Sequence, residues 1–390
     1  MKIAVYAICK NEQKHVRRWL ESAKNADTIV LLDTGSTDGT KGAVQSWLGE
    51  PSLPRNVTVF YDETRFAPWS TLEEYDTTHE RSKLYPWRFD TARNQSMELI
   101  PADTDVCICL DLDEVLCPGW REAIEAAWTP EATTGRYEYV WNFREDGSDG
   151  VKFYGEKIHR YGGCRWVGAV HEVLRYDGPR VDVQIPGLRI EHHADDSKSR
   201  GSYLPMLELA VREDPDNDRN MHYLGREYYF RGQYEKAIET LRTHLALPTA
   251  RWDEEKAASQ RYIALSCEAL GSVDNAKAWY GLAHETAPKQ REPLVGLAKL
   301  RLSEQDWKGT VEMCEAALRL TDRPMTYMCD PYAWGEGPWD LMGVALWYLG
   351  QRESARECAR KALEYNPADE RLRRNLKAMS DTPAVFTMGG

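Results

Sequence analysis

The stretch Val106-Cys107-Ile108-Cys109-Leu110-Asp111-Leu112-Asp113-Glu114 decides the fold class of the first half of the chain. Its continuous apolar run is typical of a strand that is buried on both faces of a sheet. The run ends in Asp111 and Asp113, which the i, i+2 spacing places on one face of the strand. Two such carboxylates repel each other unless a positive charge lies between them, and a hard divalent cation supplies it. The stretch therefore predicts a metal-bound nucleotide diphosphate at a strand end, with an ordinary acidic turn as the alternative.

The residues around this stretch alternate between strand and helix patterns. Short apolar runs predict strands at 2–8, 28–32, 57–61 and 106–110, and helical spacing predicts helices at 12–26 and 90–99. This order indicates an α/β domain with a mostly parallel sheet, in which ligands bind at the carboxyl ends of the strands. Asp33, Asp111 and Asp113 all come at such ends. Beyond them, extended segments at 136–143, 151–160, 166–174 and 181–191 predict hairpins and an antiparallel addition to the sheet.

The second half of the chain is helical and repetitive. One column of small residues is Gly225, Ala264, Ala298 and Gly343, and a second column, twelve residues later, is Ala237, Ala276, Thr310 and Ala355. The second and third repeats are 34 residues apart, which is the tetratricopeptide (TPR) period. We therefore expect an α/β domain over 1–197, an all-α TPR solenoid over 198–380 and a C-terminal tail over 381–390.

An insertion precedes the fourth repeat, around residues 324–338, and carries Tyr327, Tyr332 and Trp334. Two interpretations stay open for it. It is either a structural loop or an aromatic contact surface for an acceptor.

Composition limits the classes of function. The chain has 390 residues and a formal net charge of −12, which argues against a dedicated nucleic-acid binder. The apolar runs are shorter than the roughly 18 residues of a membrane span. The first residues read as a strand rather than as a signal peptide, and nine cysteines lie without a disulfide frame. These features predict a cytoplasmic protein, in the host cytoplasm if a phage encodes it.

Several motifs together resemble a family 2 type glycosyltransferase of the GT-A fold, and more narrowly the bacterial and phage subgroup that fuses this domain to TPR repeats. The matching stretches are Ala7-Ile8-Cys9-Lys10-Asn11-Glu12, Leu32-Asp33-Thr34-Gly35-Ser36-Thr37-Asp38-Gly39-Thr40, Phe89-Asp90-Thr91-Ala92-Arg93-Asn94, Leu110-Asp111-Leu112-Asp113-Glu114 and Gly168-Ala169-Val170-His171-Glu172. Their order and spacing span nearly the whole first domain. The resemblance implies a GT-A domain followed by a TPR solenoid.

The resemblance also implies a nucleotide-sugar site. Asn11, Glu12 and Asp33 would hold the nucleoside, since a carboxylate at a strand end can accept from ribose hydroxyls or a base N–H. Arg93 would hold the diphosphate. The alternative for Arg93 is a structural ion pair with Asp111 or Asp90.

In such enzymes Asp113 would bind Mn²⁺ or Mg²⁺ directly, and Asp111 would contact the metal or the sugar and ribose. His192 is the favoured third metal ligand, with His193 as the alternative. Glu114 is expected to be structural. Trp87, Trp141 and Trp166 are candidates for stacking on the base or sugar, with core positions as the alternative.

The resemblance implies that Glu172 is the general base. Many relatives carry a Glu-Asp pair at this place, whereas this chain has His171-Glu172. His171 is therefore a second candidate for the base, or a donor that orients Glu172.

The resemblance implies a metal-dependent inverting hexosyltransferase that uses a nucleotide sugar, with UDP favoured. The TPR array would select a protein or peptide acceptor, and a homodimer through the repeats is left open. The alternatives are an inactive GT-A/TPR scaffold, a transferase acting on a surface polymer or a modified DNA base, and a nucleotidyltransferase on a similar sheet.

Overall fold

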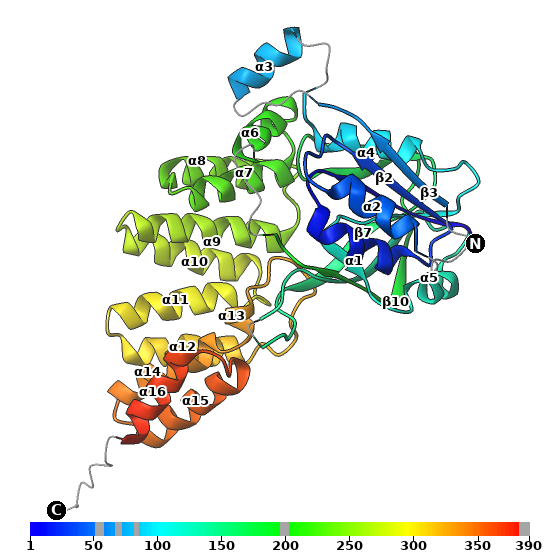
Figure 1. The fold of residues 1–390 in the computed structure, drawn as a ribbon. Coiled ribbons are helices and arrows are strands. Elements are labelled where there is room, and N and C mark those ends of the chain that lie inside the picture. Colours follow the sequence, from blue (N-terminus) through cyan, green and yellow to red (C-terminus); the bar gives the residue numbers. More distant parts are fainter. Residues whose placement is uncertain (51–57, 67–71, 82–85, 145, 196–202, 382–390) are drawn as a thin grey trace, which may run out of the picture. The chain divides into compact units, whose positions relative to one another are not determined.

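The computed structural model describes residues 1–50, 58–66, 72–81, 86–144, 146–195 and 203–381 (Figure 1). Its contacts divide the chain into two units: Met1–Asn142 with Lys152–Asp214, and Phe143–Val151 with Pro215–Gly390. The domain boundary expected at 197/198 lies outside the described residues, and so does the expected tail from 382 onward. Among the described residues, no helix is both long and apolar enough to cross a bilayer.

The first unit is built on an eight-stranded mixed sheet with the order β3-β2-β1-β4-β7-β6-β10-β5. These strands are β1 (Ile3–Cys9), β2 (Thr28–Asp33), β3 (Thr58–Glu63), β4 (Val106–Cys109), β5 (Glu114–Leu116), β6 (Thr134–Val140), β7 (Lys152–Arg160) and β10 (Asp182–His192). The strands β3, β2, β1 and β4 run parallel, as the alternating pattern predicted. The α/β prediction for this half is confirmed, because helices separate these strands along the chain.

The added strands differ in part from the expected hairpins. The strand β7 runs antiparallel to both β4 and β6, as predicted. In contrast, β10 pairs parallel with β6 and antiparallel with β5. The extended segment predicted at 166–174 is interrupted. The structure has a hairpin of β8 (Cys164–Val167) and β9 (Val173–Tyr176) there, and the two strands are separated by a turn that includes Gly168 at φ 111°.

Alternate residues of β1 supply two cores, one on each face of the sheet. Val5 and Ala7 pack with the buried side of α1 (Gln13–Ala23) and α2 (Thr40–Leu48), including Trp19 and Trp47. Ala4 and Tyr6 belong to the second core, which also includes Cys107, Cys109 and Trp166. The helix α4 (Phe89–Glu98) also contacts β1. The remaining helices of the unit are α3 (Leu72–Arg81), α5 (Trp120–Ala127) and α6 (Tyr203–Glu213). The two cores bury the parallel strands β1, β2 and β4 on both faces.

A buried histidine in this core makes the stability of the first unit depend on pH. His159 is fully buried; its Nε2 lies 2.8 Å from the hydroxyl of Tyr6, which also accepts from Trp166 Nε1. Burial lowers the pKa of His159 from 6.5 to about 4. Between these two pH values the unfolded chain binds more protons than the folded chain, so stability falls as the pH falls.

We therefore expect the wild type to lose about 2 kcal/mol of unfolding free energy through this group between pH 7.5 and pH 5. Urea unfolding of the wild type and His159→Gln at both pH values measures it. The advantage of the wild type over the variant should shrink by that amount, since other titrating groups are common to both. An unchanged difference between the two proteins would contradict the prediction.

The second unit is a stack of helices in which consecutive helices pair (Figure 1). The helices are α7 (Asp218–Phe230), α8 (Tyr234–Ala246), α9 (Asp253–Ala269), α10 (Val273–Thr286), α11 (Glu292–Ser303), α12 (Trp307–Leu318), α13 (Pro331–Trp334), α14 (Gly337–Tyr348), α15 (Arg352–Tyr365) and α16 (Glu370–Asp381). The first small-residue column lies on α7, α9, α11 and α14, and the second lies fully buried on α8, α10, α12 and α15. A Cβ at Gly225 would come within 2.5 Å of Leu241, which explains the small residue there. The predicted TPR-like array is confirmed.

The insertion before the fourth repeat packs onto this array through its aromatic residues. Trp334 is 8% exposed, and its Nε1 donates to Glu292 at 3.0 Å. The ring of Tyr327 stacks on that of Tyr223, with centroids 6.4 Å apart. These contacts give the insertion a structural role.

Candidate functional site

Asp111 and Asp113 lie in a turn rather than on a strand. The strand β4 ends at Cys109, and β5 begins at Glu114. The Glu114 amide donates to the Asp111 carbonyl at 2.9 Å, and the Asp111 amide donates to Glu114 Oε2 at 2.8 Å. The expectation that i, i+2 spacing places Asp111 and Asp113 on one strand face was therefore wrong, because the strand stops before both.

Asp111 is the centre of a cluster of charged side chains. Arg93, on the buried side of α4, reaches Asp111 Oδ1 with Nη2 at 2.8 Å and Glu172 Oε1 with Nε. Lys157 Nζ lies 2.6 Å from both Asp111 Oδ2 and Glu114 Oε1. Three carboxylates thus share two cations. The ion pair of Arg93 with Asp111, one of the two interpretations of Arg93 from the sequence, is present, while Asp90 pairs with Arg88 instead.

The charged side chains in this cluster shift one another's pKa values. Burial disfavours the ionised form of Asp111, but Arg93 and Lys157 outweigh it and hold the pKa of this carboxyl well below its usual value. Burial raises the pKa of Glu114, although Lys157 opposes that shift. Burial likewise opposes the charge of Lys157, but Asp111 and Glu114 raise its pKa well above the ordinary value. Asp111 and Lys157 are therefore both charged at neutral pH.

Sequence reasoning missed Lys157. It lies on β7, whose antiparallel register against β4 sets Ile158 beside Ile108 and so brings the neighbouring lysine to the end of β4. A pairing between strands that are far apart in the chain leaves no local pattern, so the lysine read as an ordinary strand residue. Glu114, expected to be structural, is 1% exposed and also accepts from the Tyr139 hydroxyl at 2.6 Å.

Removing this lysine should destabilise the first unit. Lys157→Met leaves Asp111 and Glu114 with one cation fewer. Because the Glu114 carboxyl is buried, removing its partner costs about 3 kcal/mol. Urea unfolding at pH 7.5 measures the loss. Lys152→Met is the matched control, because Lys152 lies on the same strand and pairs with Glu138 at a longer 3.7 Å. Equal losses in the two variants would contradict the role given to Lys157.

Asp113 and His192 form the second part of the site. His192 Nε2 lies 3.6 Å from Asp113 Oδ2, while its Nδ1 lies 2.8 Å from the Trp141 carbonyl oxygen. The Trp141 ring stacks on the imidazole at 4.4 Å. Burial lowers the pKa of His192, but hydrogen bonds to Asp113 and the Trp141 carbonyl raise it overall. His193 points elsewhere, with Nε2 3.5 Å from Glu191.

The predicted nucleoside residues lie at the carboxyl ends of β1 and β2. Asn11 has a left-handed φ of 58°, and its Oδ1 accepts from the Thr37 amide at 2.7 Å. Asp33 is 3% exposed; its Oδ1 accepts from the amides of Gly35 and Ser36, and its Oδ2 accepts from Tyr61. Glu12 is 6% exposed, and its amide donates to Thr40 Oγ1 at 2.8 Å. In this structure these groups hold the turn after β2.

Glu172 and His171 lie in the turn between β8 and β9. The Gly168 amide donates to Asp90 Oδ2 at 2.9 Å, which ties the turn to the start of α4. His171 has a left-handed φ of 51°, and its Nε2 hydrogen-bonds to the Tyr203 hydroxyl. Trp166, a stacking candidate, is 5% exposed in the core, and Trp141 is 44% exposed beside His192. The turn thus brings Glu172 into the charged cluster, and the buried Trp166 ring lies 5.3 Å from the guanidinium carbon of Arg93.

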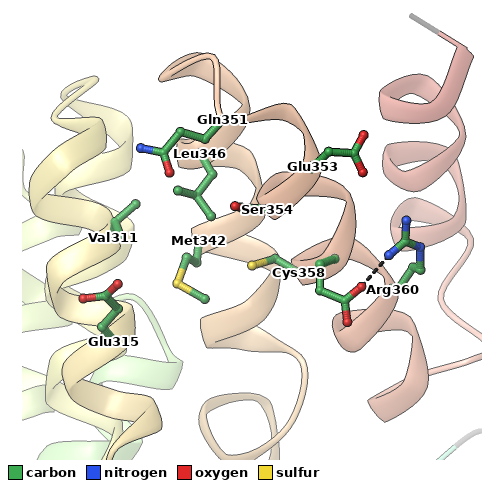
Figure 2. A pocket seen from close by; sticks show the side chains of 10 residues that line it. Val311, Glu315, Met342, Leu346, Gln351, Glu353, Ser354, Cys358 and Arg360 are labelled. Atoms are coloured by element: carbon green, nitrogen blue, oxygen red, sulfur yellow. Dashed lines mark hydrogen bonds and ion pairs between the residues drawn. The ribbon is translucent and has the colours of Figure 1, made fainter. Parts of the chain in front are cut away.

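The structure brings together Arg93, Asp111 and Glu172, and separately Asp113 and His192. Asp111, Asp113 and His192 do not form a tight trio: among the described residues, the group of three possible ligands within 4.8 Å of one another is Asp218, His244 and Glu255 in the second unit. The second unit also has a hollow of 540 Å³, shown in Figure 2, between α12, α14 and α15. Its lining combines Val311, Met342 and Leu346 with charged residues such as Glu315 and Arg360, and includes none of the predicted site residues.

Comparisons with known proteins match each half of the chain. The family model "Tetratricopeptide repeat" matches residues 338–369. The lipopolysaccharide core biosynthesis glycosyltransferase LpsC of Rhizobium meliloti (strain 1021) is 26% identical over 136 residues, which are 34% of this chain and 47% of that protein. This match lies in the N-terminal region and spans about half the length of that relative. The chain therefore contains a TPR repeat, and its N-terminal region has a distant glycosyltransferase homologue.

Solved structures resemble about half of the chain. Yeast Tom70 covers 47% of it and is matched over 37% of its own length, with 16% identity and a TM-score of 0.38. A thermophilic TPR protein of Thermus thermophilus covers 46% and is matched over 89%, with 17% identity and a TM-score of 0.35. At this level of similarity the two likenesses say nothing about function.

Proposed function

We propose that the first unit is a family 2 type, GT-A glycosyltransferase that transfers a hexose from a nucleotide sugar, with UDP favoured, and that the TPR array selects a protein or peptide acceptor. One observation carries this proposal. Arg93 joins Asp111, from the aspartate pair after β4, to Glu172, the candidate base, beside the pair of Asp113 and His192. The glycosyltransferase homologue of the N-terminal region supports the reaction class.

The residues around Asp113 fit a divalent cation. An Nδ1–H that donates to the Trp141 carbonyl leaves the Nε2 lone pair of His192 directed at Asp113, which is the usual arrangement of a metal-binding imidazole. Asp113 and His192 would hold Mn²⁺ or Mg²⁺. The bound ion would stabilise negative charge on the departing nucleoside diphosphate. Asp111, whose oxygens already accept from Arg93 and Lys157, would position these cations rather than provide the main ligand.

Glu172 would act as the general base. The acceptor gives its proton to Glu172 while its heteroatom forms a bond to the anomeric carbon, and the bond from that carbon to the diphosphate breaks on the opposite face. Arg93 donates to Oε1 of Glu172 and so fixes the orientation of the carboxylate. The proton would go to the other oxygen, Oε2, which takes no part in this hydrogen bond. His171, hydrogen-bonded to Tyr203, remains the alternative base.

A second acceptor class comes from the name of the relative. LpsC is described as an enzyme of lipopolysaccharide core biosynthesis, which favours a saccharide acceptor. Once the donor is known, labelled transfer to a peptide pool and to core oligosaccharide separates the two classes. The peptide pool should become labelled if the repeats select the acceptor.

The proposal is tested by release of nucleoside diphosphate from a panel of UDP-, GDP- and dTDP-sugars, with Mn²⁺ or with EDTA. Water serves as a slow substitute for the acceptor. We expect release from one donor, abolished by EDTA. Absence of both release and metal-dependent nucleotide binding across the panel would favour the inactive scaffold.

A further inference from the structure

A group of three possible metal ligands lies in the second unit, on residues that have no part in the proposed transferase site. Asp218 is the first residue of α7, His244 lies in the last turn of α8, and Glu255 lies in the first turn of α9. One ligand atom of each lies within 4.8 Å of the others. Three consecutive helices therefore each contribute one side chain to the same point.

The histidine of this group is buried and has an unused nitrogen. His244 is fully buried, and its Nε2 makes no hydrogen bond among the described residues, although Glu255 Oε1 lies 3.4 Å away. Glu255 itself is 4% exposed. A buried imidazole nitrogen without a hydrogen bond, beside a buried carboxylate, costs free energy unless something binds between them.

Neighbouring side chains orient both buried ligands. Ser259 Oγ lies 2.9 Å from His244 Nδ1 and 2.7 Å from His222 Nδ1. The Ser259 hydroxyl can donate to one of these imidazoles and accept from the other. When it accepts from His244 Nδ1–H, a lone pair is left on His244 Nε2. Tyr327, from the insertion before the fourth repeat, places its hydroxyl 3.5 Å from Glu255 Oε2.

The types of donor point the same way. Asp218 and Glu255 bring two carboxylates to the imidazole of His244. The donor set of one imidazole and two carboxylates suits first-row transition metals, with Zn²⁺ the most common such ion in tetrahedral sites. The alternative is a protonated His244 between the two carboxylates, which needs no metal.

We propose that Asp218, His244 and Glu255 bind a divalent transition-metal ion of the Zn²⁺ class, with water completing the coordination, and that this ion clamps α7 and α8 of the first repeat to α9 of the second. The site is independent of the transferase proposal. It would stabilise the start of the array, where the helices follow the first unit in the chain.

The test is Zn²⁺ binding to the full chain carrying Asp113→Asn, which removes the candidate ligand of the first unit from the measurement. Calorimetry and metal analysis after dialysis should give about one equivalent of Zn²⁺, with a higher thermal midpoint. Adding Glu255→Gln or Asp218→Asn should weaken binding by at least about tenfold, and Ser259→Ala by about tenfold. The Ser259 result distinguishes an oriented ligand from a nonspecific acidic patch.

Two carboxylates nearby give matched controls. Asp253→Asn removes a charge from the same first turn of α9, and Asp216→Asn removes an exposed charge just before α7. Both controls should keep full affinity. If circular dichroism shows that Glu255→Gln does not fold, the Zn²⁺ affinity of Asp218→Asn is decisive, because Asp218 is partly exposed. Absence of Zn²⁺ binding in the Asp113→Asn background, or unchanged affinity in Asp218→Asn, would overturn the proposal in favour of the protonated histidine.

Discussion

Asp113→Asn is expected to reduce metal-stimulated release of nucleoside diphosphate on the order of a thousandfold, to the level seen with EDTA. The substitution keeps the size of the side chain and removes the anionic oxygen beside His192 Nε2. The loss follows because charge on the departing diphosphate is then left without the cation. Initial rates at saturating donor, with Mn²⁺ and with EDTA, measure it.

Asp103→Asn is the control for this experiment. Asp103 lies on the same unit, is exposed, and pairs with Lys2 on the surface. Its rate should match the wild type. If the Asp113→Asn enzyme still responds fully to Mn²⁺, Asp113 is not a metal ligand. Asp111 is then the remaining candidate of the aspartate pair.

Glu172→Gln should reduce sugar transfer by roughly a hundredfold to ten-thousandfold while leaving nucleotide affinity nearly unchanged. Glutamine can still accept from Arg93, so the turn between β8 and β9 keeps its anchor, but it cannot take a proton from the acceptor. The transfer rate and the dissociation constant of the nucleoside diphosphate are measured on the same preparations.

His171→Gln is the informative companion, since both residues are candidates for the base. Its transfer rate should fall much less, because the imidazole is held by Tyr203, whereas Glu172 is held by Arg93 within the charged cluster. The reverse order, with His171→Gln nearly inactive and Glu172→Gln active, would move the base to His171.

Local pattern was sufficient for much of the architecture. The apolar run 106–110 contains the buried strand Val106–Cys109, and the small-residue columns lie on paired helices. These predictions succeeded because a buried strand requires apolar residues, and the close approach of two paired helices requires small ones. The parallel pairing of β6 with β10 had no such local signature.

The motifs named Asp111, Arg93 and Glu172 in separate stretches of the sequence, and the structure brings these side chains together. Their roles in a transferase site stay a prediction. Lys157 was missed because only the register between β7 and β4 brings it to Asp111. Sequence reasoning did not single out Asp218, His244 and Glu255, because they lie at the ends of three different helices. An acid in the first turn of a helix and a histidine in the last turn interact favourably with the helix dipole, so each residue has an ordinary explanation there.

The most direct measurement is calorimetric binding of UDP to the full chain, with Mn²⁺ and with EDTA, compared between the wild type and Asp113→Asn. It needs neither the sugar nor the acceptor. We predict binding by the wild type that requires Mn²⁺ and that falls to the EDTA level in Asp113→Asn. UDP binding that is equally tight with EDTA, and unchanged by the substitution, would contradict a metal-held nucleotide at this site.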